Sequence, residues 1–491
     1  MMKVNQTTII GMLIVFVATP LWAKEAMNIS LERKNSNILT LQSVLERVEK
    51  GHPLLKGSRT EKIVASGKLL KAMGQFEPSI VNDYELERLA KNGGTTASVG
   101  FNDTFVEMRH PWGIKGFAGF RAGIGSVEVA DLDINDSNQP LLGIMFPLLR
   151  GLITNPEHAE LKKSSLAEKQ AKFEIQQSRQ DLYLGAAIQY WNWVAAWKAM
   201  ELQKRAVAVA EDRFKQLEKQ AEAGARAKFD VIEGEQEVQR RKDKLIKSRR
   251  QVEKEQFKLA LFLWENDALI VPDSFKAPLF PQARLTYSLK SLEEGKRRAA
   301  TVRPELQLIG LEAEFNNIDM EVAENNLFPD LNVEVQPTRK PGEFVLGLGY
   351  RFGVQLSFPF NQRKARGELL QMSGKAKRLK YRQRFRLKKV IMDVENAHSA
   401  VVRAAERIKV SQKALLLAKQ LEKGERTRFN LGATSLLIVN LRERNVIKAA
   451  EEWITAKADH QKALALFKWS TGEWVNGLTF VGIHEKKKGR Q

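Results

Sequence analysis

Few side chains in this sequence are placed to do chemistry. Its 491 residues include no cysteine, and the six histidines are scattered at positions 52, 110, 158, 398, 460 and 484. No two of them have the spacing of metal ligands. No nucleophile–base pattern or phosphate-binding glycine loop stands out either. The sequence therefore predicts a protein that is not an enzyme and that holds no metal or cofactor.

Two glycines and the charged residues after them are the remaining candidates. Gly224, in EAGARAKFDV, is followed by Asp230 and Glu233, and Gly432, in NLGATSLLIV, interrupts a second helical run. An interior glycine costs a helix about 1 kcal/mol relative to alanine, so glycine is normally found at a turn or a helix end. We therefore expect both glycines to lie at turns.

The elements around these glycines occur twice. VRPELQLIG (302–310) matches GHPLLKGSR (51–59), and QKALALFKW (461–469) matches QFKLALFLW (256–264). The first half carries 39 extra residues in a Gly-rich region around 91–135. We expect this insertion either to extend a strand hairpin or to form a separate loop. The chain is therefore predicted to be an internal duplication.

Each half contains a long helical hairpin with the glycine at its tip. A helical run of about 65 to 70 residues, about 100 Å at 1.5 Å per residue, precedes each glycine, and a shorter run returns from it. The returning runs have apolar residues every seven positions, typical of a coiled coil. The seam positions are Val231, Val238, Leu245, Val252 and Leu259, then Val439, Val446, Trp453, His460 and Phe467. We expect His460 to pack in this seam.

Strands are predicted where the period changes to two. Every even position from Phe344 to Phe360 is apolar, and most odd positions are small or polar, as in a membrane barrel strand between lipid and water. The predicted lipid face comprises Phe344, Leu346, Leu348, Tyr350, Phe352, Val354, Leu356 and Phe358. Residues 331–335 form its expected partner, and a weaker pair is expected at 80–86 and 142–148. Four strands per chain cannot close a barrel, and lipid does not tolerate an open edge, so several copies should share one barrel.

These elements predict an α+β membrane protein, internally duplicated. Residues 1–23, with Lys3 before an apolar run, are expected to be a secretory signal peptide. Residues 24–266 form the first repeat, 267–290 an irregular equatorial linker, and 291–475 the second repeat with its strand pair at 329–360. Residues 476–491 form a basic tail.

The chain is strongly basic, with a formal net charge of +21. Residues 361–389 hold twelve Lys/Arg and the single acid Glu368. An exported protein seldom meets nucleic acid, so we expect no nucleic-acid partner. The cluster fits either an outer face near lipid phosphates or a tunnel wall that favours anionic cargo.

Residues 38–475 resemble the TolC family of outer-membrane efflux and secretion channels. The resemblance rests on the duplication, on RPEL (303–306) followed by FPDL (328–331), on YW (190–191) and on RFNLGATSLLIV (428–439). It implies a homotrimer with a twelve-stranded β-barrel in outer-membrane lipid of a Gram-negative bacterium, and a twelve-helix α-helical tunnel in the periplasm. It also implies a periplasmic adaptor (membrane fusion protein) docked at the tips, and an inner-membrane ABC, RND or MFS transporter that feeds the exit duct.

The same resemblance places the gate and the adaptor-docking surface at the tips. The matching residues are Gly224, Arg226, Asp230, Glu233, Phe429, Gly432, Thr434, Ser435, Ile438 and Leu441. Some relatives have an acidic ring after the second turn. The matched positions here are Ile438 and Leu441, so no cation-binding acidic ring is expected from this helix. Asp230 and Glu233 after the first turn could still supply acid, or they could be ordinary solvated residues.

A different class of protein competes with the channel. A periplasmic coiled-coil adaptor or scaffold without a pore would have the signal peptide and the heptads, but it would not need the alternation from Phe344 to Phe360. A basic helical protein that binds polyanions is a second alternative, and its affinity would fall steeply with salt.

Overall fold

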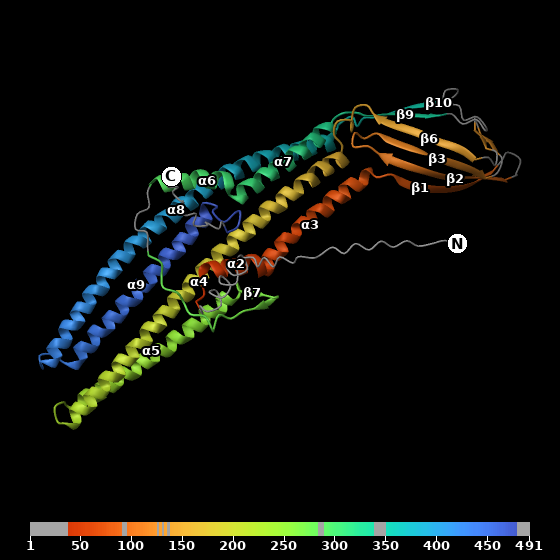
Figure 1. Ribbon diagram of the computed structural model, residues 1–491. Helices are drawn as coiled ribbons and strands as arrows, with labels where there is room; N and C mark the ends of the chain where they lie inside the picture. The colour runs from red at the N-terminus through yellow and green to blue at the C-terminus, as the bar shows by residue number, and fades with distance from the viewer. Residues whose placement is uncertain are drawn as a thin grey trace, which may run out of the picture.

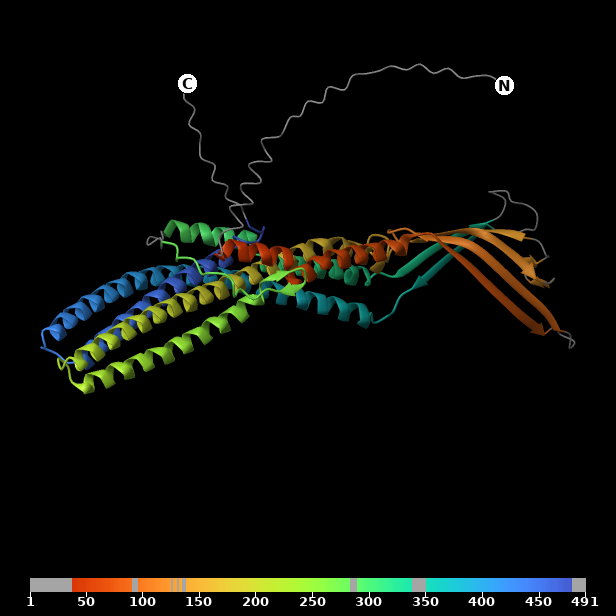
Figure 2. The ribbon, with the colours of Figure 1, turned by 60° about the horizontal axis from the view of Figure 1, so that its bottom comes forward.

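The computed structural model describes residues 38–90, 96–124, 127–129, 132–134, 138–282, 289–337 and 350–478. The molecule is elongated, with a β-sheet at one end and the turns of two helical hairpins at the other (Figures 1 and 2). The predicted signal peptide, residues 479–491 of the tail, and Phe344, Leu346 and Leu348 of the predicted lipid face lie outside the described residues.

Two long helical hairpins dominate the described part, as the sequence predicted. Helix α4 (Pro156–Glu222) turns into α5 (Lys228–Ala260), and α8 (Arg363–Asn430) turns into α9 (Leu436–Ser470). The shorter helices are α2 (Leu41–Gly51), α3 (Pro53–Met73), α6 (Leu289–Val302) and α7 (Pro304–Asn325). The matched prolines Pro53 and Pro304 start α3 and α7, where a missing N–H costs nothing. None of the described helices is both long and apolar enough to cross a bilayer.

Both hairpins turn at glycine by the same backbone pattern. Gly224 has φ +71° and Gly432 has φ +74°. The amide of the next residue donates five positions back, from Ala225 to the Gln220 carbonyl and from Ala433 to the Arg428 carbonyl, each at 2.8 Å. This hydrogen bond ends the helix with a left-handed residue, which glycine adopts without a Cβ penalty.

Six of the ten predicted seam residues are buried, and the other four are half-buried. Val238, Leu245, Val252 and Leu259 are buried on α5, while Val439 and His460 are buried on α9. Burial lowers the pKa of the His460 imidazole, which keeps the ring neutral in the seam. Among the residues that the structure describes, no three His, Asp or Glu side chains gather in a way that could hold a metal.

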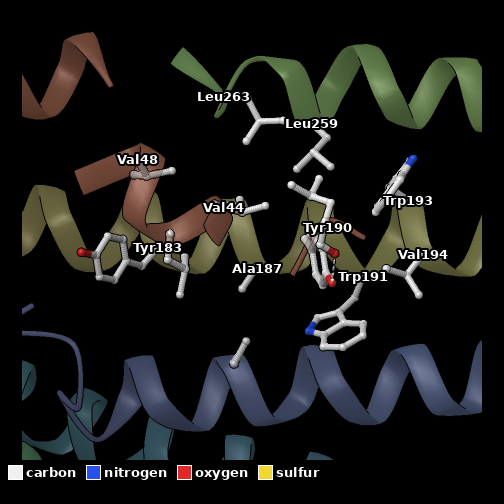
Figure 3. Close-up of a cluster of buried hydrophobic side chains, with 14 of the residues drawn as sticks. Val44, Val48, Tyr183, Ala187, Tyr190, Trp191, Trp193, Val194, Leu259 and Leu263 are labelled. Carbon is white, nitrogen blue, oxygen red and sulfur yellow. Dashed lines mark hydrogen bonds between the residues drawn. The ribbon is translucent and has the colours of Figure 1, made fainter. Parts of the chain in front are cut away.

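The largest core cluster lies where α2 crosses α4 and the end of α5 (Figure 3). Tyr190 and Trp193 of α4 pack there with Val48 and Leu259. The Tyr190 hydroxyl donates to the Leu39 carbonyl at 2.9 Å, which satisfies its only polar atom. Tyr190 and Trp193 of α4 are therefore packing residues.

The main sheet has six strands, and the prediction of four strands was wrong. The strands lie in the order β1 (Ser79–Ala90), β2 (Thr96–Arg109), β3 (Lys115–Ile124), β6 (Asn138–Pro147), β9 (Asp330–Pro337) and β10 (Tyr350–Ser357). All neighbours are antiparallel. The insertion supplies β2 and β3, which separate β1 from β6. Short strands β4 (Val127–Val129) with β5 (Leu132–Ile134), and β7 (Trp264–Glu265) with β8 (Ala268–Leu269), form two further small sheets.

The sheet has one apolar face and one polar face. Cross-strand register places exposed apolar side chains from all six strands on the same side. This apolar face comprises Ile80, Tyr84, Leu86, Val106, Met108, Phe120, Leu142, Ile144, Val335, Phe352, Val354 and Leu356. The opposite, polar face carries Asp83, Asp103, Arg121, Asn332, Glu334 and Gln355.

Candidate functional site

The two hairpin tips contact each other. Arg226, just after the first turn, donates from Nη2 to the Phe429 carbonyl at 3.3 Å. Its guanidinium also lies over the Phe429 ring, 4.2 Å from the centroid, a cation–π contact of about 0.5 to 2 kcal/mol. Phe429 is buried with Leu217, Leu436 and Val439. The tip of α4 and α5 is therefore packed on the tip of α8 and α9.

A buried carboxylate near the tips joins all four long helices. Glu443 of α9 accepts at Oε1 from Arg213 of α4 (2.5 Å) and from Arg426 of α8 (3.1 Å). Its Oε2 accepts from Arg241 of α5 at 2.5 Å. Only 5% of Glu443 is exposed. Charge-assisted hydrogen bonds of this kind are about twice as strong as neutral ones.

A second acid and an amide complete the network, which we call the Glu443 cluster: Arg213, Glu237, Arg241, Arg426, Asn440 and Glu443. Glu237 accepts from Arg241 Nε at 2.9 Å, and Asn440 accepts from Arg213 at 2.8 Å. Burial lowers the pKa of the Arg213 guanidinium, although the Glu443 carboxylate opposes this shift. Arginine stays charged in proteins, so the cluster keeps buried cations that need their acids.

Three of the ten predicted tip residues, Arg226, Glu233 and Phe429, take part in contacts between the hairpins. Gly224 and Gly432 form the turns, while Arg226 contacts Phe429 and Glu233 accepts from Asn440 at 3.2 Å. The other five lie around the turns without such a link between the hairpins. Asp230 is in the first turn of α5, Ser435 is the residue before α9, Thr434 and Ile438 are half-buried, and Leu441 is exposed. Their roles in gating and docking stay predictions.

The Glu443 cluster was missed from the sequence. Glu237 and Arg241 are four residues apart on one helix, a spacing that favours an ion pair and was a usable signal. Nothing local indicated that Glu443, 202 residues further on, lies against Arg241. That contact depends on how the two hairpins pack.

Five of the eight residues of the predicted lipid face are described, and their contact with lipid stays a prediction. Phe352, Val354 and Leu356 lie on the apolar face of β10, and Phe358 follows the strand with its side chain exposed. Tyr350 is the first residue of the strand. The basic run 361–389 starts α8 directly after β10, and within it Arg382 pairs with Glu312 of α7 at 3.0 Å.

Comparison with known proteins finds similarity at the level of structure. No protein-family model matches the sequence, and no curated protein matches it. The outer-membrane channel OprN is 14% identical, with a TM-score of 0.66 over 88% of this chain and 89% of that one. The CmeC outer-membrane channel of Campylobacter jejuni is 12% identical, with a TM-score of 0.64 over 88% and 85%. The outer-membrane protein VceC of Vibrio cholerae is 12% identical, with a TM-score of 0.62 over 88% and 96%. The chain therefore has the TolC-type fold of these outer-membrane proteins, with long helical hairpins below a β-sheet.

Proposed function

We propose that this chain is the outer-membrane exit duct of a tripartite efflux or type I secretion system. The apolar face of the sheet is the observation that supports this function best. It carries exposed large apolar side chains on all six strands, for example Phe352 at 59% exposure, while charged residues lie on the opposite face. Lipid outside and water inside is the environment that such a sheet needs.

Three copies sharing one barrel would give every strand a neighbour. The described sheet leaves one edge of β1 and one edge of β10 without a partner strand. Because neighbours alternate in direction over six strands, β1 and β10 run antiparallel to each other. The β10 edge of one copy can therefore pair with the β1 edge of the next, and unpaired edges in lipid are avoided.

The helical hairpins would then form the periplasmic tunnel. Their tips lie at the end far from the sheet (Figure 1), where a periplasmic adaptor and an inner-membrane pump would engage them. The Glu443 cluster would restrain the tips, because separating the hairpins would take Glu443 away from Arg213 and Arg241. Passage of cargo requires movement of these tips and no bond chemistry.

The native mass of protein extracted by detergent from outer membranes tests this function. We expect a particle of three copies that conducts ions when it is inserted into a planar bilayer. A monomer or dimer that needs no detergent, or a trimer without conductance, would refute the duct. Of these two refuting results, the monomer or dimer that needs no detergent would favour a periplasmic scaffold.

A further inference from the structure

The inserted hairpin, β2 and β3, lies within the sheet, between β1 and β6. We infer that it is part of the transmembrane wall, so that three copies close an eighteen-stranded barrel instead of a twelve-stranded one. This inference rests on the proposed function, because it requires a shared barrel of three copies. It concerns the width of the pore.

Backbone pairing places the hairpin between the other strands. All twelve residues of β1 pair with β2, from Ser79 with Glu107 to Ala90 with Thr96. β2 pairs with β3 from Gly100 to Arg109, and β3 pairs with β6 from Lys115 to Ala122. In this sheet β1 and β6 meet only through the hairpin, so a barrel that excluded β2 and β3 would break two ladders and form a new one.

The hairpin follows the two faces of the sheet, except that Asn102 and Thr104 of β2 lie on the apolar side, where both accept hydrogen bonds from Asn82 of β1. Met108 and Phe120 are half or more exposed on the apolar face. On the polar face, Arg121 donates from Nε to Asp103 Oδ1 at 2.5 Å. A charged side chain on the lipid side of a barrel costs about 2 to 4 kcal/mol at the bilayer midplane. The polar face must therefore line the lumen in β2 and β3, as in the strands on either side.

An aromatic contact fixes the hairpin against its neighbour on that lumen side. The Phe117 ring of β3 lies over Gly143 of β6, where a Cβ would overlap the ring. Phe117 also meets Phe105 of β2, with 5.7 Å between ring centroids. Glycine leaves room here for a ring that lies flat on the neighbouring strand.

The tunnel-side turn of the hairpin is tied to the start of α4. Asn155 donates from Nδ2 to the Pro111 carbonyl and accepts at Oδ1 from the His158 amide, each at 2.8 Å. The second of these bonds is the N-cap of α4. Arg109, the last residue of β2, pairs with Glu157 in the first turn of the same helix. The Asn155 side chain thus caps the N-terminus of α4 and also holds the turn between β2 and β3.

The wider barrel also matches the tunnel beneath it. With strands about 4.8 Å apart and tilted by about 40°, eighteen strands give a backbone radius of about 18 Å, and twelve give about 12 Å. Each chain places α3, α4, α7 and α8 in contact below the sheet. Twelve such helices spaced about 8 to 10 Å apart form a ring of about 15 to 19 Å radius. The eighteen-stranded barrel therefore continues the tunnel without a step inward.

Single-particle imaging of the purified full-length protein in detergent tests the inference. We expect a trimer with eighteen strands and a barrel about 1.5 times wider than a twelve-stranded one. Deleting residues 96–124 should leave a trimer with a twelve-stranded barrel, because β1 and β6 run antiparallel and can then pair. A wild-type trimer with twelve strands and the hairpin outside the wall would overturn the inference and leave the duct intact. The absence of any shared barrel would overturn both.

Cross-linking gives a second measurement that does not depend on the deletion variant. The chain has no cysteine, so introduced pairs form the only disulfides. Ala118 and Leu142 are directly opposite on β3 and β6. The double variant Ala118→Cys/Leu142→Cys should therefore cross-link within one chain in outer membranes. Ile80→Cys/Leu142→Cys is the control, since the register aligns Ile80 with Leu142 through Val106 and Ala118, and two strands separate these positions by about 14 Å. A cross-link in the control pair alone would place β6 beside β1 and refute the inserted wall.

Discussion

Replacing Glu443 by glutamine should release the two hairpins from each other. The substitution keeps the size of the side chain and removes the charge that three arginines share. Arg241, whose side chain is 4% exposed, retains Glu237 at 2.9 Å, while Arg213 retains only the neutral Asn440. Breaking a buried ion pair by removing one partner costs about 3 to 5 kcal/mol. Because the amide still accepts one hydrogen bond, we expect the lower end, about 3 kcal/mol.

Hydrogen exchange of the tip helices measures this loss. A local opening that is about 3 kcal/mol easier corresponds to about a 100-fold faster exchange, at 1.4 kcal/mol per factor of ten. The effect should appear in amides around Arg213, Arg241 and Glu443. It should be absent around Trp193, which packs in the largest core cluster, where none of these arginines takes part.

Glu406→Gln is the matched control on α8. Glu406 pairs with Arg403 at 2.8 Å, but both side chains are more than half exposed, so the pair is worth about 0 to 1 kcal/mol. Exchange at the tips should therefore change less than about fivefold in this variant. If Glu443→Gln also stays within that range, the Glu443 cluster does not hold the hairpins together, and the reasoning is wrong.

Three further predictions follow from single sites. Gly432→Ala should destabilise the turn by about 1 to 2 kcal/mol, because φ is +74° while no atom crowds the new methyl group. Gly424→Ala, inside α8 with equally open surroundings, should stabilise by up to about 1 kcal/mol, and denaturant unfolding compares the two. Burial raises the pKa of the Glu49 carboxyl, but hydrogen bonds from Tyr183 and Arg179 outweigh it, so the pKa lies below its ordinary value of 4.5. The ionised carboxylate therefore stabilises the fold above pH 4.5, and this contribution is lost as the pH falls further. Thermal unfolding of Glu49→Gln should accordingly depend less on pH below that value than that of the wild type, and equal slopes would contradict the assignment. Val354→Arg on the apolar face should cost about 2 to 4 kcal/mol and reduce the yield of assembled trimers in outer membranes, whereas Gln355→Arg on the polar face should not.

The sequence predicted well those parts of the fold that a local periodic pattern of apolar residues indicates. Seam residues such as Val238, Leu245 and Leu259 recur every seven positions, and each is buried. The turn glycines were recognisable because few other residues adopt a positive φ at a helix end. The apolar face of β10 was predictable in the same way, because its apolar residues recur at every second position.

The strand count failed because the insertion does not follow a simple period. In β3 the aromatic residues Phe117 and Phe120 lie on opposite faces, and glycine and alanine fill most of the remaining positions. An apolar residue on the polar face is tolerated here because Phe117 covers Gly143 on the next strand. That compensation is a contact between strands, so no pattern within β3 alone could reveal it.

The sequence by itself determined which segments are helix, where the hairpins turn and which strand face is apolar, since these depend on neighbours within a few positions. Only the tertiary structure decided which strands pair and which charges meet. Arg213, Arg241, Arg426 and Glu443 come from four helices, and they form one cluster because the two hairpins pack side by side in a single register. Such contacts depend on the packing of distant segments, which local periodicity does not encode.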